Sequence, residues 1–514
     1  MKLVFVLFDS LVRQALGCYG GMSIATPNLD RFARKAITFD THYVGSLPCM
    51  PARRDLHTGR LNFLHRSWGP LEPFDNSFPE LLRRRRIYTH LVSDHCHYFE
   101  DGGWTYHQRY SSWEFVRGQE TDKWKAMVQP PIERFREMYD LEQYDLDLWE
   151  SRWRTHAVNR EFIREEEDFP CVRCFAAAFD FLELNRTADD WFLQLECFDP
   201  HEPFHAPARF REPYRTGYQG PILDWPRYGK VVEDELARQE IRANYAALVA
   251  MCDHYFGRLL DYFDEHDLWR DTALILTTDH GFLLVEHDWW GKNRMPFYDE
   301  IAHIPLMMYH PALADRGDQR RRSLTQTIDV MPTILDLFGI APPPEVRGRS
   351  MMPVLERDEQ IRGAALFGMF GAATNVTDGR YTYFRYPPDI ASQEIYEYTL
   401  MPTHCFGPFA LEEFEGAALA GPFDFTKGVQ LLKLPARNGA MRPPGQDNQT
   451  YEDTTTVLFD LETDPGQERP IDDPAAIARL EEQIVAIMSD HDAPPEAFRR
   501  IELPLPETAR HAIA

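Results

Sequence analysis

Cys49 stands just before a helical segment that begins with proline, in the run Cys49-Met50-Pro51-Ala52-Arg53. Proline is favoured in the first turn of a helix, so Cys49 is expected just before that helix. Unpaired amide N–H groups and the positive end of the helix dipole would stabilise an anion there, and Arg53, one turn further on, could point back toward it. The segment predicts a nucleophile beside an oxyanion site. A buried structural cysteine is the alternative, and these residues by themselves favour it.

Asp9 and the pair Asp279-His280 each follow an apolar run of strand length. In a doubly wound sheet the carboxyl ends of the strands meet at one edge, where such folds bind ligands. Two carboxylates and an imidazole at one place suit a divalent metal ion. The local alternatives are that Asp9 caps a following helix and that Asp279-His280-Gly281 is a plain turn.

The elements that must position these residues follow from the hydrophobic pattern. Apolar runs alternate with helical patterns, which predicts an α/β fold with a large, mixed but mostly parallel sheet flanked by helices on both faces. Strands are expected at 3–8, 38–44, 88–93, 192–198 and 273–278. Helices are expected after Pro27, Pro51 and Ser77, over 234–263 and near 475–488.

The Pro-rich stretch after Gly339 marks a connection between two parts of the chain. We expect residues 1–345 to form a large catalytic domain and residues 346–514 a smaller α+β domain. A charged and aromatic insert at about 113–170 reads as a solvated amphipathic helix pair. Residues 385–453 lack periodicity and are expected to form a long excursion without a core element.

The chain is strongly acidic. Asp and Glu outnumber Lys and Arg by 81 to 55, which gives a formal net charge of −26. A field of this sign repels nucleic acid and anionic membranes, so neither is expected as a partner. It also repels an anionic small substrate. A sulfate or phosphate site would therefore need a locally positive pocket.

Neither a membrane span nor a secretory leader is evident. No stretch approaches the roughly 20 apolar residues that cross a bilayer, and the amino-terminal run MKLVFVLFDS reads as a buried strand. A cytoplasmic location is expected. The eight cysteines lack the spacing of a disulfide framework, so they are expected to be reduced, and the Cys171-Val172-Arg173-Cys174 run favours a core or surface pair over a zinc site.

The segment from Gly17 to Arg60, which contains Cys49, Pro51 and Arg53, resembles the type I sulfatase family of the alkaline phosphatase superfamily, including its phosphonate monoester hydrolase branch. Five further segments are similar to family blocks and occur in the family's order: Phe198–Phe204, Thr277–Gly281, Glu286–Lys292, Ile328–Ile340 and Leu458–Pro465. The resemblance implies an alkaline phosphatase-like fold and hydrolysis of sulfate esters.

In this family the cysteine of the CxPxR signature is oxidised to formylglycine by a formylglycine-generating enzyme, and the resemblance implies the same for Cys49. It also implies one divalent metal ion held by Asp9, Cys49, Asp279 and His280. Ca²⁺ is the expected ion, and Mn²⁺ and Mg²⁺ are the alternatives. His201 and Lys292 match positions that contact the sulfate group and the leaving oxygen. A lysine there can neutralise oxygens of the ester or protonate the leaving group.

Two departures from the family pattern leave the substrate open. Many sulfatases have two adjacent acids after the first strand, whereas this chain has Asp9-Ser10. In lacking the second acid, this chain resembles the phosphonate hydrolase branch. The family's Lys-x-His pair is replaced by a stretch that contains His95 and His97 but no lysine. Either histidine is a candidate for the base that takes a proton from the nucleophile.

The alcohol portion of the substrate is not specified, and a small-molecule or a saccharide sulfate ester fits equally well. Five residues are candidates for substrate contacts: Ser10, Trp104, Arg117, Trp290 and His404. A phosphonate monoester or phosphodiester hydrolase with the same site is the alternative activity. A catalytically silent member that binds anions or glycans is the alternative from another class. A homo-oligomer is left open.

Overall fold

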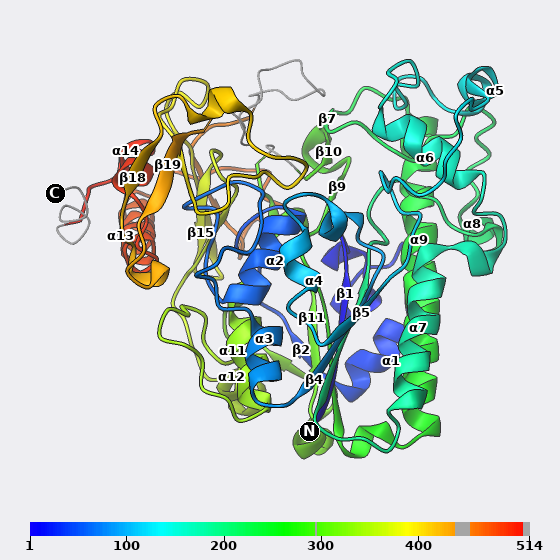
Figure 1. Ribbon diagram of the computed structural model, residues 1–514, viewed down its shortest axis with the longest axis horizontal. Helices are drawn as coiled ribbons and strands as arrows, with labels where there is room; N and C mark the ends of the chain where they lie inside the picture. The colour runs from blue at the N-terminus through cyan, green and yellow to red at the C-terminus, as the bar shows by residue number, and fades with distance from the viewer. Residues whose placement is uncertain (293–295, 437–452, 507–514) are drawn as a thin grey trace.

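The computed structural model describes residues 1–292, 296–436 and 453–506 (Figure 1). Its centre is an eight-stranded sheet in which every adjacent pair is parallel except for the two pairs made by β11. The strand order is β12 (Gln319–Arg321), β2 (Ile37–Phe39), β11 (Leu306–Tyr309), β8 (Thr272–Thr278), β1 (Lys2–Phe8), β6 (Trp191–Cys197), β4 (Tyr88–Ser93) and β5 (Ser112–Phe115). The prediction of a large, mixed but mostly parallel sheet is confirmed.

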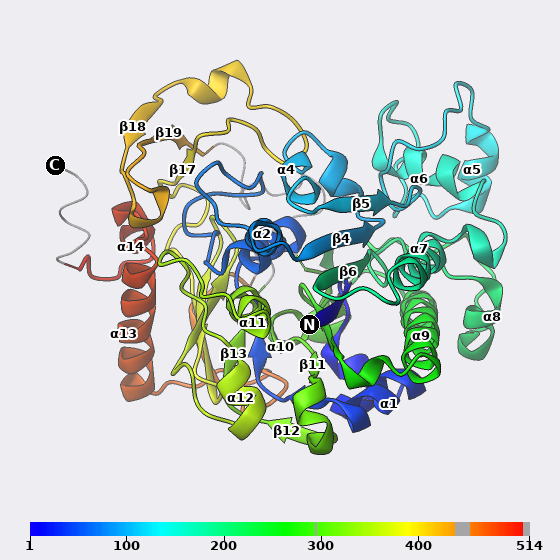
Figure 2. The same ribbon diagram turned by 60° about the horizontal axis from the view of Figure 1, so that its bottom comes forward.

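Strand β1 is buried on both faces, which explains its unbroken apolar run. Its even-numbered residues Val4, Val6 and Phe8 share a core with α1 (Pro27–Lys35), α7 (Pro170–Leu184) and α9 (Glu235–Glu265). Its odd-numbered residues from Leu3 to Leu7 point the other way, as alternation in a strand requires, into a second core. That core is completed by α2 (Cys49–Thr58), α3 (Phe78–Arg84), α11 (Val330–Leu337) and α12 (Met352–Arg357). Figure 2 shows these two helical layers on opposite sides of the sheet.

Two smaller antiparallel sheets lie in the carboxy-terminal part of the chain. One has the order β14 (Ala365–Gly368), β15 (Thr374–Thr377), β16 (Tyr381–Arg385) and β20 (Val457–Asp460), and packs on α13 (Pro474–Asp490). The other has the order β17 (Tyr396–Thr399), β19 (Leu431–Pro435) and β18 (Ala418–Ala420). Shorter elements are β3 (His42–Tyr43), β7 (Gly229–Lys230), β9 (Leu283–Leu284), β10 (Trp289–Gly291), β13 (Thr325–Gln326), α4 (Trp104–His107), α8 (Ala208–Arg211), α10 (Asp299–Ala302) and α14 (Pro495–Arg499).

The structure differs from the sequence-based expectation in four places. The single strand expected at 38–44 is divided into β2 and β3, which belong to different sheets. The excursion at 385–453 contains the sheet of β17, β18 and β19, with its own apolar cluster around Tyr398 and Leu431; its residues 437–452 lie outside the described chain, as do 507–514 of the expected second domain. The insert at 113–170 holds α5 (Ile132–Met138) and α6 (Arg152–Arg160), but these pack around a small aromatic core and are not simply solvated. Helix α2 begins at Cys49 itself.

Candidate active site

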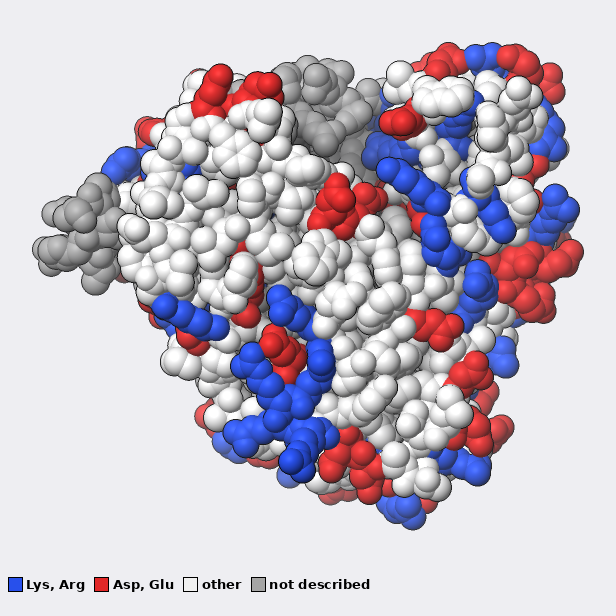
Figure 3. Space-filling view, viewed as in Figure 1, with Lys and Arg blue, Asp and Glu red and all other residues white. Residues whose placement is uncertain are grey.

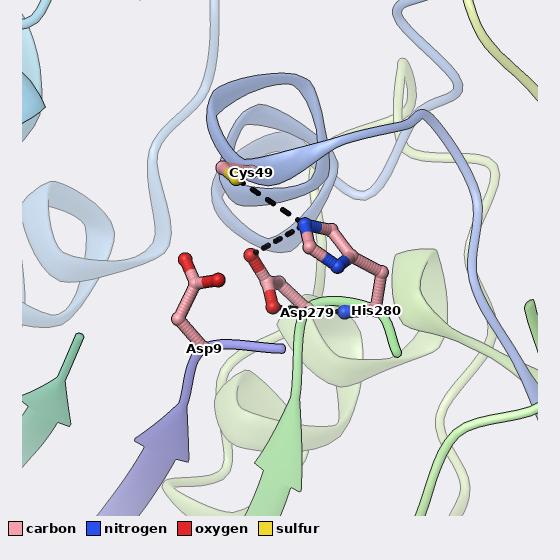
Figure 4. Close-up of side chains that lie close together, drawn as sticks. All are labelled: Asp9, Cys49, Asp279 and His280. Carbon is pink, nitrogen blue, oxygen red and sulfur yellow. Dashed lines mark hydrogen bonds and ion pairs between the residues drawn. The ribbon is translucent and has the colours of Figure 1, made fainter. Parts of the chain in front are cut away.

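The ends of β1 and β8 bring two acids together. These strands are parallel neighbours in which Phe8 pairs with Thr278, so the next residues, Asp9 and Asp279, leave the sheet side by side. Both carboxyl groups are fully buried. Figure 4 shows them at the same edge of the sheet, facing the first turn of α2. The convergence expected at the carboxyl edge of the strands is therefore observed.

Cys49 and His280 complete a four-residue cluster with these acids. The Cys49 Sγ lies 3.2 Å from His280 Nε2, and that nitrogen lies 3.3 Å from Asp279 Oδ2. One ligand atom from each of Asp9, Cys49, Asp279 and His280 lies within 4.8 Å of all the others. His280 Nδ1 is 2.9 Å from the carbonyl oxygen of Gly281, which fixes the proton on Nδ1 and turns the Nε2 lone pair into the cluster.

Arg53 is buried behind the cluster and is held by three carboxyl groups. Its Nε donates to Glu196 over 2.6 Å, and its two terminal nitrogens donate to Asp279 over 2.7 Å and to Asp9 over 2.9 Å. Glu196 in β6 also accepts a bond of 2.9 Å from the Tyr98 hydroxyl. The sequence-based reasoning missed Glu196, although an acid inside the apolar strand WFLQLEC is a signal that could have been read.

Lys292 is buried on the opposite side of Asp9. Its Nζ donates to Ser10 Oγ over 2.9 Å, and lies 3.7 Å from Asp9 and 3.8 Å from Glu202. The Ser10 hydroxyl donates in turn to Asp9 over 2.7 Å. Burial alone would raise the pKa of Asp9, but Lys292 and Arg53 hold that pKa well below its ordinary value. Asp9 is therefore a carboxylate at neutral pH.

His201 and Lys292 both lie beside the carboxyl group of Glu202. Its Nδ1 is 2.5 Å from the Glu202 carbonyl oxygen and 3.3 Å from the Glu202 carboxyl group. Burial and the charge of Lys292 lower the pKa of His201 well below its ordinary value, so the ring is neutral. The Glu202 Oε2 atom is buried without a hydrogen-bond partner among the described residues. Glu202 is a second acid of the site that the sequence-based reasoning did not single out.

His95 and His97 both reach the site, at different depths. His95 Nε2 lies 3.6 Å from Asp9, and neither ring nitrogen of His95 has a hydrogen-bond partner among the described residues. The His97 ring lies 5.0 Å from the His95 ring and sits further out. It belongs to a separate group with Cys96 and Glu120, in which its Nε2 is 3.7 Å from the Glu120 carboxyl group.

The charges of the site do not make the locally positive pocket that an anionic substrate needs. The cations Arg53 and Lys292 face four carboxyl groups, those of Asp9, Asp279, Glu196 and Glu202. A divalent cation among Asp9, Asp279 and His280 would offset this excess of acidic groups. The composition of the cluster therefore fits a metal ion on electrostatic grounds as well as on its geometry.

The remaining candidates for substrate contacts make other contacts. Arg117 forms a two-pronged ion pair with Asp122, and His404 bonds to Glu413 over 2.8 Å. The Trp290 ring is buried in the core, and its indole N–H donates to Glu233. Trp104 begins α4 and is half exposed. Among the described residues none of these four side chains forms a hydrogen bond or an ion pair with the metal-type cluster, whereas the Ser10 hydroxyl donates to Asp9.

Comparison with known proteins identifies the family of the chain. Residues 2–340 match the family described as Sulfatase, and residues 285–404 match the carboxy-terminal region of N-sulphoglucosamine sulphohydrolase. The chain is 28% identical over 374 residues to the multifunctional alkaline phosphatase superfamily protein PehA of Trinickia caryophylli. The aligned region covers 65% of this chain and 71% of that protein. It is 25% identical over 406 residues to the N-acetylglucosamine-6-O-sulfatase of Bacteroides thetaiotaomicron, covering 70% and 71%.

Two solved structures share the fold over nearly the whole chain. One is described as bound to its substrate D-glucosamine-2-N,6-O-disulfate, with a TM-score of 0.64, 15% identity and coverage of 96% of this chain and 99% of that one. The other is the phosphonate monoester hydrolase of Agrobacterium radiobacter, with a TM-score of 0.64, 18% identity and coverage of 95% and 96%. No helix of the described residues combines the length and apolarity of a membrane span. With two thirds of its length matched by one family, the chain belongs to the sulfatase family and is a sulfuric ester hydrolase.

Proposed function

We propose that this protein hydrolyses sulfate esters with a formylglycine made from Cys49 and with one divalent metal ion held by Asp9, residue 49, Asp279 and His280. The observation that carries the proposal is the position of Cys49 Sγ, at the first residue of α2 and inside a cluster of metal-type ligands. A thiol there has little nucleophilic character, because burial and the nearby Asp9 raise the pKa of Cys49 well above its ordinary value. Oxidation to an aldehyde removes that obstacle.

The ligand set fits Ca²⁺, Mn²⁺ or Mg²⁺. Two carboxyl groups supply hard oxygens, and one imidazole nitrogen makes the set more tolerant of Mn²⁺ than an all-oxygen site is. When bound, such an ion would polarise the ester and lower the pKa of a hydroxyl on residue 49. Arg53 is proposed to act on this chemistry through the two acids. Its bonds to Asp9 and Asp279 orient the two carboxyl groups.

The chain's own residues supply the proton transfers. The aldehyde of formylglycine takes up water to give two hydroxyl groups, of which one attacks sulfur and the other, after losing its proton, expels sulfate. His95 is the better placed of the two histidines to take that proton, because its ring nitrogens have no other hydrogen-bond partner in the described chain. Lys292 would stabilise or protonate the leaving oxygen. His201 would do so only after taking up a proton on Nε2, because its Nδ1 proton is bonded to the Glu202 carbonyl oxygen.

A phosphonate monoester or phosphodiester is the second candidate substrate. Ser10 favours this second candidate, because its neutral hydroxyl stands where many sulfatases have a second acid. Ser10 bonds to Asp9 and Lys292, so the site has one negative charge fewer there than a sulfatase with two adjacent acids. We further propose a saccharide or small-molecule sulfate ester as the natural substrate, a formylglycine-generating enzyme as the maturation partner, and the division into domains at residues 345 and 346.

Parallel assays on one sample test the proposal. Protein produced together with the maturation enzyme is assayed on 4-nitrophenyl sulfate, a phenylphosphonate monoester and a phosphodiester, and its metal content is measured. The Cys49→Ser variant should retain metal but lose turnover, because a serine lacks the second hydroxyl that expels sulfate. Equal turnover by this variant on sulfate esters would rule out the formylglycine mechanism, and a preference for phosphonate would establish the second candidate.

A further inference from the structure

Phe406 is a large apolar side chain held in solvent, with 54% of its surface exposed. It occupies the tip of a tight turn, which is closed by a hydrogen bond of 2.8 Å from the backbone N–H of His404 to the carbonyl oxygen of Gly407. A bridge between Thr403 and Pro408 continues the turn. The His404 ring is tied to Glu413 over 2.8 Å. The exposure of Phe406 is therefore fixed by a rigid frame around it.

The same turn is locked to a distant part of the chain at Gly102. The Gly102 N–H donates to the Cys405 carbonyl oxygen over 2.9 Å, and Cys405 is fully buried. A Cβ atom at position 102 would lie 2.1 Å from the carbonyl oxygen of His404, so only glycine allows this approach. Figure 2 shows the gold segment that contains this turn beside α4, which begins two residues after Gly102.

Phe406 lies at the outer end of a line of rings that leads to the catalytic cluster. Its ring is 5.0 Å from the His97 ring, at 81°, and His97 is 5.0 Å from His95. His95 in turn lies 3.6 Å from Asp9. Trp68 flanks the outer end of this line, 5.6 Å from Phe406 and 5.7 Å from His97. The two outermost rings, Trp68 and Phe406, form what we call the outer aromatic pair.

We infer that the outer aromatic pair binds a ring of the alcohol portion of the sulfate ester, through the flat apolar face of an aryl group or of a sugar. This inference rests on the proposed function, since it places the sulfate at Asp9 and Lys292 and the alcohol outward from there. Aromatic side chains bind such faces because stacking removes apolar surface from water. A small alkyl alcohol would not reach the pair.

The polar groups beside His97 suit the edge of such a ring. The Glu120 carboxyl group lies 3.7 Å from His97 Nε2 and is nearly buried. Its backbone φ is 39°, a left-handed conformation that a glutamate rarely adopts and that is maintained by the surrounding structure. A carboxyl group fixed in this place can accept a hydrogen bond from a hydroxyl of a sugar. An aryl ring would gain nothing from it, so Glu120 separates the two classes of ring.

The test uses sulfonates, which carry a carbon–sulfur bond that this enzyme cannot hydrolyse and which report binding without turnover. Naphthalene-2-sulfonate, a 6-sulfonated hexose and methanesulfonate are titrated calorimetrically into the wild-type enzyme and into Phe406→Ala. The wild type should bind at least one of the ring compounds about tenfold more tightly than methanesulfonate, a difference of ~1.4 kcal/mol. Phe406→Ala should remove that difference and leave methanesulfonate binding within about twofold.

Matched variants separate stacking from general damage to the turn. Phe406→Trp should keep the preference for the ring compound, and Leu411→Ala, at a residue that is 85% exposed on the same segment, should change nothing. Gly102→Ala should act like Phe406→Ala, because it displaces the turn. Glu120→Gln should weaken the hexose compound and spare the naphthalene compound if the natural ring is a sugar.

The results that overturn the inference are distinct from those that overturn the proposed function. Equal binding of all three sulfonates by the wild type, or an equal loss of all three in Phe406→Ala, would show that the outer aromatic pair does not bind the ring. Selective ring binding by an enzyme that hydrolyses no sulfate ester would leave the pair in place and reject the proposed reaction. The tighter of the two ring compounds identifies the class of alcohol.

Discussion

The guanidinium group of Arg53 donates through Nε to Glu196 over 2.6 Å, which anchors it to the central strand β6. Its other two nitrogens are then directed at Asp9 and Asp279. All three bonds are buried, where a guanidinium fork paired with carboxylates is strong and fixed in direction. Three of the five N–H donors of Arg53 are therefore taken up by carboxyl groups, which supports the proposal that Arg53 positions Asp9 and Asp279.

Replacement of Glu196 by Gln should release Arg53 and loosen both acids. We expect the metal affinity to fall by about 10- to 100-fold, as is usual when a group that orients a ligand is lost, together with a lower Tm, because a buried charge loses one partner. Metal content after dialysis against a buffered chelator measures the first effect. Arg54→Lys, which disturbs the neighbouring buried pair with Asp75, should lower Tm without loss of metal. Equal metal retention in both variants would reject the positioning role.

Lys292→Ala should slow the hydrolysis of esters with poor leaving groups more than that of esters with good leaving groups. A lysine that protonates or neutralises the leaving oxygen matters most when the alcohol is a poor leaving group. We expect kcat to fall by about 10²- to 10⁴-fold on an alkyl or sugar sulfate, and by much less on 4-nitrophenyl sulfate. Lys230→Ala, which removes a half-buried partner of Asp453, is the control and should leave both rates unchanged. A uniform loss on all substrates would place Lys292 in binding of the sulfate group alone.

Ser10→Asp should change the metal preference. Ser10 has a φ of 60°, which Asp tolerates better than most residues, and an acid there would add a hard oxygen beside Asp9. The ratio of Ca²⁺ to Mn²⁺ affinity should therefore rise. Ser10→Asn introduces a side chain of the same size as Asp but without its charge, and should leave the ratio near that of the wild type. Competition titrations with both ions measure it, and an unchanged ratio in Ser10→Asp would mean that position 10 does not face the metal.

The stability of the protein should fall below pH 6.5, partly because of His57. Burial and the charge of Arg109 lower the pKa of His57 to about 3 in the folded protein, whereas the unfolded chain titrates near 6.5. Above pH 6.5 both states are neutral, and below it only the unfolded state takes up the proton, which favours unfolding.

His57→Gln removes this titration and keeps a polar group near Ser77, to which His57 Nδ1 is bonded over 2.8 Å. Between pH 6 and pH 4 the free energy of unfolding should fall less steeply in the variant, by up to ~1.4 kcal/mol per pH unit. Chemical unfolding at pH 7.5, 6, 5 and 4 measures the slope. Parallel slopes for the two proteins would show that His57 is charged in the fold.

Local patterns in the sequence predicted the central sheet, and the four residues of the cluster were predicted from these patterns together with the family resemblance. The short, unbroken apolar runs before Asp9 and Asp279 are typical of buried strands, and parallel strands bring their ends together. Glu196 was missed because a single acid in an apolar strand has no local meaning until Arg53 arrives from another element. Phe406 was missed because its place depends on contact with Gly102, some 300 residues away in sequence.

The mass of the peptide that contains residue 49 tests the central claim most directly. Formylglycine is about 18 Da lighter than cysteine, because an aldehyde oxygen replaces the thiol. Protein made together with a formylglycine-generating enzyme should yield this lighter peptide, in a proportion that tracks sulfatase activity from one preparation to the next. Full sulfatase activity in a preparation whose peptide retains the mass of unmodified Cys49 would contradict the account.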